Sequence, residues 1–463
     1  MSYVTENPRG GCVLAGINSV LAAINHVCPI LHSGPGCCMQ TTAAEQGNSG
    51  HKHACFVSGV SLPSSNMLEK EVVFGGVNKL RTTIKGAIEV IDADAYFVLT
   101  GCTAGIIGDD IQSVTDEFTE EGHKVYAIDT PGFAGDSLLG YETVWNTFLD
   151  KVIQPPRSKE EQARVRGTAS VSGTSPSATS PSPTAGAPSS AGALRPLVNI
   201  FGIVPYHDPY WSGSLEEIDR ILSKLGIEVN TFFTKHQGID VIEHCSEADL
   251  NIIINPWLFN GPAKKFEKKF GVPSLRFPFV PVGATDTSRF VREVAAALKL
   301  DPALVDRVIA EEEDYVYSYL AQSIGQLSWK RFAVAGDASS AIGLTRYLAN
   351  DYSFSPVLVV ITENIYRPED KERIIQNISQ LEYATPPKIV FASDQWEINQ
   401  TILNEPEDIS LLVGSTNEKE IGLEKQIQFL NATFPLNDRL VFNRTYAGYR
   451  GSLTFTEDLY DNL

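Results

Sequence analysis

Short apolar runs without charged residues recur along the chain and constrain its fold more than any other feature. Examples lie at 95–100, 197–204 and 357–361. A strand that is covered on both faces has no solvated side, so such runs are typical of parallel sheets packed between helices. Segments with helical periodicity separate the runs. The pattern therefore predicts an α/β protein with mostly parallel sheets.

A segment of unusual composition divides the chain. Ser, Thr, Pro, Gly and Ala dominate from Gly167 to Gly192, and such a segment buries too little apolar surface to offset the entropy of ordering it. We therefore predict a flexible linker over 156–196. It separates a first α/β domain over 1–155 from two further Rossmann-like domains, over 197–330 and 331–463.

Length and charge exclude several classes of partner. The chain has 463 residues and a formal net charge of −19. No apolar run approaches the roughly 18 residues that a membrane-spanning helix needs, so no membrane partner is expected. Nucleic acids are bound mostly through clustered Lys and Arg, which makes them unexpected partners too. The first eight residues have neither the basic stretch nor the apolar core of a signal peptide, which predicts a cytoplasmic protein.

Three cysteines stand beside glycine: Cys12 in Gly10-Gly11-Cys12, Cys37 in Gly34-Pro35-Gly36-Cys37, and Cys102 in Gly101-Cys102. An iron–sulfur cluster is several ångströms across and approaches the backbone closely, which glycine permits because it has no β-carbon. The shared setting indicates a buried cluster held by all three thiols. For any one of them alone, a buried thiol that acts only as a small apolar side chain is the commoner case.

The remaining cysteines lack this setting and are predicted to be structural thiols: Cys28, Cys38, Cys55 and Cys245. The total of seven is odd, which disfavours a disulfide framework. His51, His53 and Cys55 alternate as on one face of an extended segment. They could contribute to a zinc site, but an exposed polar loop is favoured.

Other short motifs have ordinary structural explanations. Asp109 and Asp110 are predicted to open a helix and to cap it. The segment 73–76 could present N–H groups to an anion or could pack beneath the cysteine loops. Gly336-Asp337 follows a predicted strand, but it is only half of a dinucleotide-binding fingerprint, so NAD binding is not expected.

Five segments together resemble the component 1 subunits of nitrogenase and of nitrogenase-like reductases, and they keep the order and spacing of that family. These segments are 11–16, 32–37, 71–76, 101–110 and 130–135. Weaker similarity continues to the segment 448–451, and only the linker has no counterpart. The resemblance implies the nitrogenase component 1 fold, with three Rossmann-like domains.

The resemblance also implies a role in electron transfer. Cys12, Cys37 and Cys102 match the cysteines that hold half of a P-cluster, an iron–sulfur centre of the 8Fe-7S type. The other half belongs to a homologous α-like catalytic subunit, in a heterotetramer with two copies of each. In that family an ATP-dependent Fe protein, reduced by ferredoxin or flavodoxin, delivers electrons through this centre. The catalytic cofactor on the partner then reduces dinitrogen or another inert small molecule, such as a thioether.

Within this resemblance the chain is β-like. The catalytic subunit of the family anchors its cofactor with a Cys in the middle domain and a His in the last domain. Here the first position is Asn255, and no histidine follows His244. Gly132 replaces a Ser that can ligate the oxidised P-cluster in β-type subunits, which places the chain away from the standard β lineage and puts ligand exchange there in doubt.

Two other functions stay open. Scaffold subunits for biosynthesis of the nitrogenase iron–molybdenum cofactor share the fold, although retention of all three cysteines disfavours a scaffold. A small-ligand binding protein with incidental cysteines is the remaining alternative. No catalytic residue is predicted in this chain under any of these hypotheses.

Overall fold

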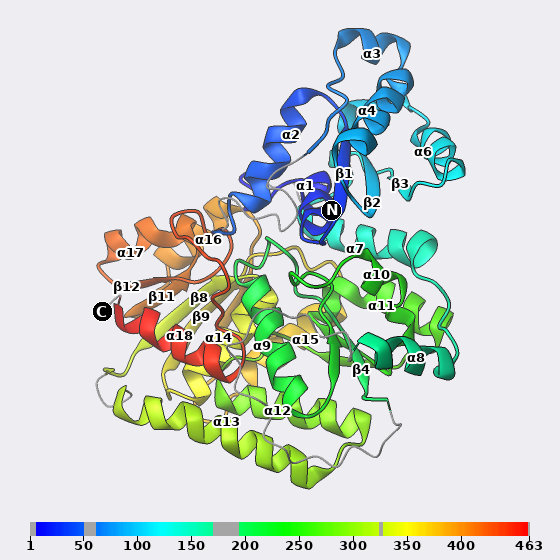
Figure 1. Ribbon diagram of the computed structural model, residues 1–463. Helices are drawn as coiled ribbons and strands as arrows, with labels where there is room; N and C mark the ends of the chain where they lie inside the picture. Colours follow the sequence, from blue (N-terminus) through cyan, green and yellow to red (C-terminus); the bar gives the residue numbers. More distant parts are fainter. Residues whose placement is uncertain (1–5, 51–61, 170–193, 324–326, 462–463) are drawn as a thin grey trace.

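The computed structural model describes residues 6–50, 62–169, 194–323 and 327–461. It contains three sheets, and all strand pairs within them are parallel. The predicted α/β class with three Rossmann-like units is therefore confirmed. Figure 1 shows the first sheet and its helices projecting from a larger body that holds the other two sheets.

The first sheet has the order β1-β2-β3, with strands β1 (Val27–His32), β2 (Ala95–Thr100) and β3 (Val125–Ile128). Successive residues of β2 face opposite sides. Val98 packs with helices α4 and α6, whereas Phe97 packs with α1 and α7. Both faces are therefore covered, as the apolar run predicts. The helices of this part are α1 (Val13–Ala22), α2 (Pro35–Thr41), α3 (Glu69–Phe74), α4 (Val77–Val90), α5 (Cys102–Ile107), α6 (Ile111–Glu120) and α7 (Ser137–Thr147).

The second sheet has the order β5-β4-β6-β7, with strands β4 (Leu197–Phe201), β5 (Glu228–Asn230), β6 (Leu250–Ile254) and β7 (Ser274–Phe277). Its helices are α9 (Trp211–Lys224), α10 (Ile239–Glu243), α11 (Pro256–Phe270), α12 (Gly283–Leu298) and α13 (Pro302–Ser323). β4 ends three residues before the predicted run does. Gly202 follows it with φ +96°, and a Cβ there would lie 1.3 Å from the carbonyl oxygen of Ile254, so the backbones cross too closely for any other residue.

The third sheet has the order β10-β9-β8-β11-β12, with strands β8 (Arg331–Gly336), β9 (Ser355–Ile361), β10 (Lys388–Phe391), β11 (Leu411–Gly414) and β12 (Gln428–Asn431). Starting from β8 in the middle, β9 and β10 are added on one side, and β11 and β12 are then added on the other side. This is the strand order of one half of a doubly wound sheet, extended by two strands. Its helices are α14 (Ala338–Asn350), α15 (Pro368–Ser379), α16 (Gln395–Leu403), α17 (Lys419–Lys425) and α18 (Gly448–Asp461).

One apolar core runs through all three sheets, from Val13 to Leu459. The last helix, α18, does not stay with the third sheet but packs against α9, α12 and α13 of the second unit. The three units are thus fused through shared core rather than joined by loose connections, and this fusion fixes the cysteine loops relative to the cleft described below.

The predicted linker contains a helix at its start. α8 (Lys159–Ala169) lies within 156–196, and its Arg166 pairs with Glu228 of β5. The segment predicted as a flexible linker therefore includes a helix near its start, since charged residues at 159–166 support a helix before the Ser- and Pro-rich stretch begins. Residues 170–193 lie outside the described part. No helix in the described ranges is long and apolar enough to cross a membrane.

Candidate functional site

The three predicted cysteines lie where helices begin. Cys12 is the N-cap residue of α1, Cys37 is the third residue of α2, and Cys102 is the first residue of α5. Cys102 is therefore helical rather than in a loop as predicted. β1 and β2 are neighbours in register, and each leads at its carboxyl end into a cysteine helix. Ligand sites of open α/β sheets lie at this edge.

Two of the three sulfurs face the same small space. An added Cβ on Gly132 would lie 3.0 Å from Cys12 Sγ and 3.1 Å from Cys102 Sγ. Gly132 begins the 3₁₀ helix η2 (Gly132–Ala134), and the neighbouring segment 135–137 fixes the Cys12 loop because Val13 N–H donates to the Gly135 carbonyl at 2.9 Å. Backbone hydrogen bonds between these two segments thus bring Cys12 next to Gly132, 120 positions later in the chain.

Two of the glycines beside the cysteines have a structural reason that differs from the predicted one. A Cβ on Gly11 would meet Ala15 and Ala44 at 2.6 and 2.8 Å, and a Cβ on Gly101 would meet Ser33 Oγ at 1.9 Å. Both glycines therefore permit close packing of protein on protein. Gly36 has nothing within 4 Å, so it leaves open space beside Cys37.

The thiols are free and partly exposed at all three positions. Within the described ranges, no three His, Cys, Asp or Glu side chains approach closely enough to hold a single metal ion. A cluster with several irons has its ligands spread over its surface, so this finding excludes a mononuclear site of described residues and leaves a larger centre compatible with the cysteines.

The other described cysteines are structural, as predicted. Cys28 and Cys245 are buried, and burial raises the pKa of Cys28 to about 12 and that of Cys245 further. Cys38 is half-buried, and its thiol donates to the carbonyl of Leu62 at 3.6 Å. The candidate zinc residues His51, His53 and Cys55 lie outside the described residues.

Asp109 organises the layer beneath the cysteines. Its carboxylate accepts the backbone N–H of Gly76 at 2.9 Å and contacts His32 Nε2 at 2.9 Å, while His32 Nδ1 lies 2.9 Å from Ser65 Oγ. The anion that meets the segment 73–76 is thus a side chain of the chain itself. Burial lowers the pKa of His32 below its ordinary value, against the effect of Asp109. Capping is confirmed for Asp110, whose side chain accepts the N–H of Ser113.

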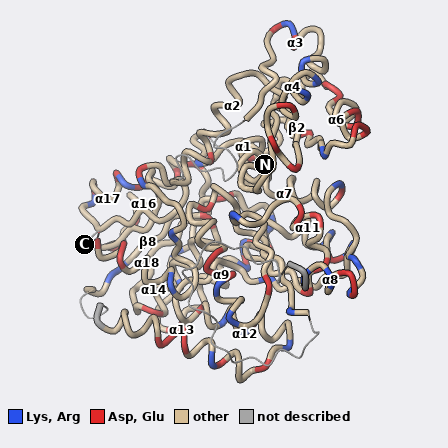
Figure 2. The backbone as a smooth tube through the Cα atoms, viewed as in Figure 1, with Lys and Arg blue, Asp and Glu red and all other residues tan. Residues whose placement is uncertain are grey.

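An apolar rim surrounds the cysteine helices. Its members are exposed to between 65% and 81%: Met39 on α2, Ile106 on α5, Phe133 on η2 and Phe74 on α3. α3 packs against α5, and α2 against α1. Neither α2 nor α5 contains a charged residue, and in Figure 2 the tube of α2 has no charged position whereas α6 has several acidic ones. Monomers rarely leave so many large apolar side chains exposed together, so this face is suited to a protein partner.

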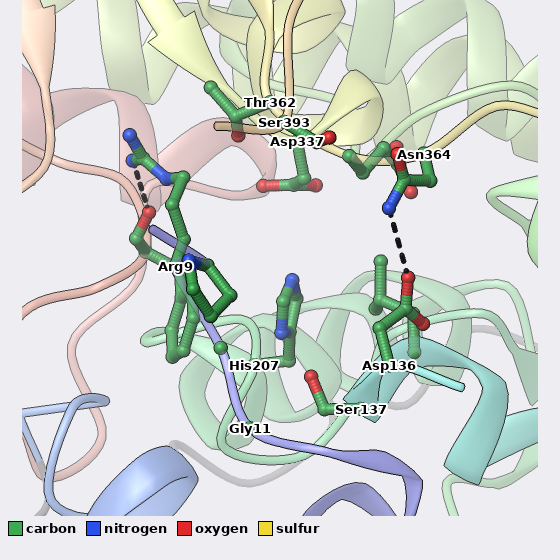
Figure 3. Close-up of a pocket in the computed structure, with 14 residues that line it drawn as sticks. Arg9, Gly11, Asp136, Ser137, His207, Asp337, Thr362, Asn364 and Ser393 are labelled. Carbon is green, nitrogen blue, oxygen red and sulfur yellow. Dashed lines mark hydrogen bonds between the residues drawn. The ribbon is translucent and has the colours of Figure 1, made fainter. Parts of the chain in front are cut away.

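A cleft between the three units is the second candidate site. It encloses about 120 Å³, and Figure 3 shows His207 and Asp337 pointing toward each other across it, with Asp136 at one side. A smaller adjoining cavity shares His207, Asp337 and Glu363 and extends to Asn255. Asn255 Oδ1 is buried and has no hydrogen-bond partner in the described part of the chain. The position that the resemblance compares with a cofactor-anchoring cysteine therefore does lie at this cleft.

The lining of the cleft is acidic. Burial, with repulsion from Asp337, raises the pKa of Asp208 to about 7 and that of Glu363 to about 8. Burial alone would lower the pKa of His207, but Glu45, 3.5 Å away, raises it above the ordinary value. No cysteine lines either cavity. The residues present therefore do not fit an iron–sulfur cofactor, because the thiolate ligands that it requires are absent.

Glu45 links the two candidate sites. One of its oxygens accepts the backbone N–H of Gly11, next to Cys12, at 2.9 Å, and the other faces His207. Sequence analysis missed both Glu45 and His207. Neither belongs to a local motif, and only the folded chain brings them together.

Comparison with known proteins identifies the family. The family model described as nitrogenase component 1 type oxidoreductase matches residues 12–463. The chain belongs to this family. It is 25% identical over 452 residues to the nitrogenase iron–molybdenum cofactor biosynthesis protein NifE of Clostridium pasteurianum, covering 97% of this chain and 86% of that protein.

Subunits of nitrogenase itself are similar as well. The molybdenum–iron protein beta chain of Bradyrhizobium diazoefficiens is 23% identical over 480 residues, covering 99% of this chain and 84% of that protein. Among solved structures, one of nitrogenase Cp1 at pH 6.5 superposes with a TM-score of 0.74 at 20% identity, covering all of this chain and 93% of that one. This likeness establishes the nitrogenase component 1 fold.

Proposed function

We propose that the chain is a β-like subunit of a nitrogenase or nitrogenase-like oxidoreductase that acts in the cytoplasm. In this proposal Cys12, Cys37 and Cys102 hold half of a P-cluster-like iron–sulfur centre. Electrons enter from an ATP-dependent Fe protein and leave toward a catalytic cofactor on a homologous α-like subunit, in an α₂β₂ assembly. The substrate is dinitrogen or another inert small molecule.

The observation that carries the proposal is the convergence of Cys12 and Cys102 on Gly132 at the sheet edge. Thiolates are the ligands that iron–sulfur clusters require, and half-buried thiols beside an apolar rim can be reached by a cluster from outside the chain. When bound, such a centre accepts and releases single electrons. Three cysteines supply only part of the ligands of an 8Fe-7S centre, so a partner subunit must supply the rest.

The chain's own residues shape the environment of this centre. Gly132 leaves room beside two of the sulfurs. Phe133 and Ile106 project next to the cysteine helices, and burial of these side chains against a partner would exclude water from the site. Solvent exposure shifts cluster potentials, so this exclusion supports a defined potential for electron transfer.

The acidic cleft supports the β-like assignment. With Asn255 in place of a cysteine and with carboxylates around it, the cleft lacks the thiolate that would anchor a catalytic cofactor. The cofactor would then belong to the partner subunit, and no residue of this chain would take part in making or breaking substrate bonds.

The decisive experiment is anaerobic purification of the chain together with its α-like partner. Iron and sulfide analysis, with EPR and Mössbauer spectroscopy, should reveal a P-cluster-like centre. Cys102→Ala should lower the iron content and abolish electron delivery. Cys28→Ala removes a buried thiol of β1 that packs with α4 and α6, and it should leave the iron content and electron delivery unchanged. An iron-free wild-type complex that still reduces substrate would overturn the proposal.

A scaffold for iron–molybdenum cofactor biosynthesis is the second candidate. The similarity to NifE over 97% of the chain favours it. The two functions differ in what the purified complex does. A reductase complex turns over substrate with Fe protein and ATP, whereas a scaffold complex transfers a bound cofactor precursor to a cofactor-free acceptor and shows no such turnover.

A further inference from the structure

A basic cleft shares no lining residue with the acidic one. It is formed by α11, β7 and α15, and it encloses about 550 Å³. Small-molecule sites commonly enclose about 300–1,000 Å³. Its lining contains four cationic side chains and one carboxylate: Lys264, Arg276, Arg367, Arg373 and Glu369. The lining therefore has a local excess of positive charge in a chain whose net charge is −19.

Two of the four cations share one ion-pair partner within the chain. Asp370 lies 2.5 Å from Arg367 and 3.6 Å from Arg373. The side-chain oxygen of Asn260, with its amide oriented toward Arg367, also accepts from that guanidinium at 3.2 Å. These contacts fix Arg367 in place at the wall of the cleft.

The other two cations, Lys264 and Arg276, have no ion pair or hydrogen bond within the described ranges. They come from α11 and β7 and line the same cleft. Like charges in one cleft repel, and Glu369 is the one carboxylate in the lining that offsets part of this repulsion. An anion placed between them would remove it.

A third hydrogen-bond donor, the indole of Trp257, is also consistent with an anionic ligand. Trp257 lines the cleft, and its indole N–H is buried without a hydrogen-bond partner in the described part of the chain. An unsatisfied buried donor costs free energy unless a ligand or water accepts from it. An oxyanion has the acceptors that this N–H and the guanidinium of Arg276 require.

We infer that this cleft binds a small multivalent oxyanion, either a phosphate compound or a polycarboxylate. Arg276 can present two parallel N–H groups to one oxyanion, and Lys264 adds a point charge. Trp257 donates at the inner wall. A single charge would satisfy only one of the two free cations, so the ligand carries two or more.

The test measures binding to the full chain at low ionic strength, by isothermal titration calorimetry, with pyrophosphate, citrate and acetate as probes. Wild-type protein should bind pyrophosphate or citrate and bind acetate much more weakly. Arg276→Gln and Lys264→Gln should each weaken binding by about tenfold or more, since each removes a charge-assisted hydrogen bond. Tighter binding of pyrophosphate than of citrate indicates that the ligand is a phosphate compound, and the reverse indicates a polycarboxylate.

The matched control is Lys268→Gln, which removes the same charge from the same helix outside the cleft. It should change the affinity by no more than a factor of about two. Added salt should weaken the binding of the anion to the wild type and to every variant that still binds it. Trp257→Phe keeps an aromatic ring but loses the donor, and it should also bind less tightly. Absence of binding to wild-type protein, or equal weakening by the control, would overturn the inference. Unchanged thermal unfolding of each variant shows that it is folded.

Discussion

The sulfur of Cys12 lies 3.0 Å from the position that a Cβ on Gly132 would occupy. The sulfur of Cys102 is 3.1 Å from the same position, so a methyl group there presses on both thiols. We expect Gly132→Ala to displace at least one sulfur, to lower the iron content of the anaerobically purified complex and to destabilise the fold by about 1–3 kcal/mol. Iron analysis and thermal unfolding measure both effects.

Gly36→Ala is the matched control. Gly36 lies next to Cys37 inside α2, and a Cβ there meets nothing within 4 Å. Alanine is also the better helix former, so this variant should be as stable as the wild type or more so. Equal iron content in the two variants would show that the space at Gly132 is unimportant for the cluster.

Phe133 tests the proposed partner surface. Its side chain is 65% exposed beside Gly132. A charge placed there must lose its hydration when a partner covers the face, so Phe133→Glu should weaken assembly with the α-like subunit by about tenfold or more. Analytical ultracentrifugation measures the assembly. Leu423→Glu, at a 73% exposed position on α17, should leave it unchanged, and comparable loss in both variants would place the partner elsewhere.

Most of the strands that sequence analysis identified are apolar runs. β1, β5 and β12 were missed, and all three are edge strands. β1 contains Pro29, which cannot donate to a ladder and is tolerated at an edge. β5 has only three residues, two of them polar, Glu228 and Asn230. β5 therefore lacks the signal of a buried strand, whereas β1 is buried along its whole length and is interrupted only by its proline.

The candidate site was predictable only in part. Glycine next to cysteine, together with the resemblance, selected Cys12, Cys37 and Cys102, and the fold places Cys12 and Cys102 at Gly132. The connection from Gly11 through Glu45 to His207 was not predictable, because it depends on three segments that meet only after folding. The acidity of the cleft was hidden for the same reason, since Asp208 and Asp337 come from different units.

Substitution of Arg9 tests whether its buried ion pair holds the segment before Cys12 against the third unit. Its guanidinium is buried and lies 2.7 Å from Glu418, and it also donates to the carbonyl of Phe434. Removing one partner of a buried pair leaves the other charge uncompensated, so Arg9→Met should destabilise the chain by about 3–5 kcal/mol in urea unfolding. Arg81→Met breaks a half-exposed pair with Glu117 and should cost no more than about 1 kcal/mol. Similar losses would contradict a structural role for the buried pair.

Asp208 should make the stability of the fold depend on pH. Burial and the nearby charge of Asp337 raise its pKa from 3.8 to about 7. The folded chain therefore holds this proton more tightly than the unfolded chain does, so stability falls as the pH rises from about 4 to about 7. Asp208→Asn removes the titration, and its amide oxygen can still accept the N–H of Tyr210, now 2.8 Å from the carboxylate.

Urea unfolding at several pH values between about 5 and 8 measures the difference. The wild type should lose stability over this range, and Asp208→Asn should lose less of it. The pKa of Glu363, raised to about 8, leaves a residual decline in the variant. Asp116→Asn neutralises an exposed carboxylate on α6 and should follow the wild type. Parallel curves for wild type and Asp208→Asn would mean that Asp208 is already ionised in the folded chain at the lower pH, and that the cleft is open enough to hydrate its charge.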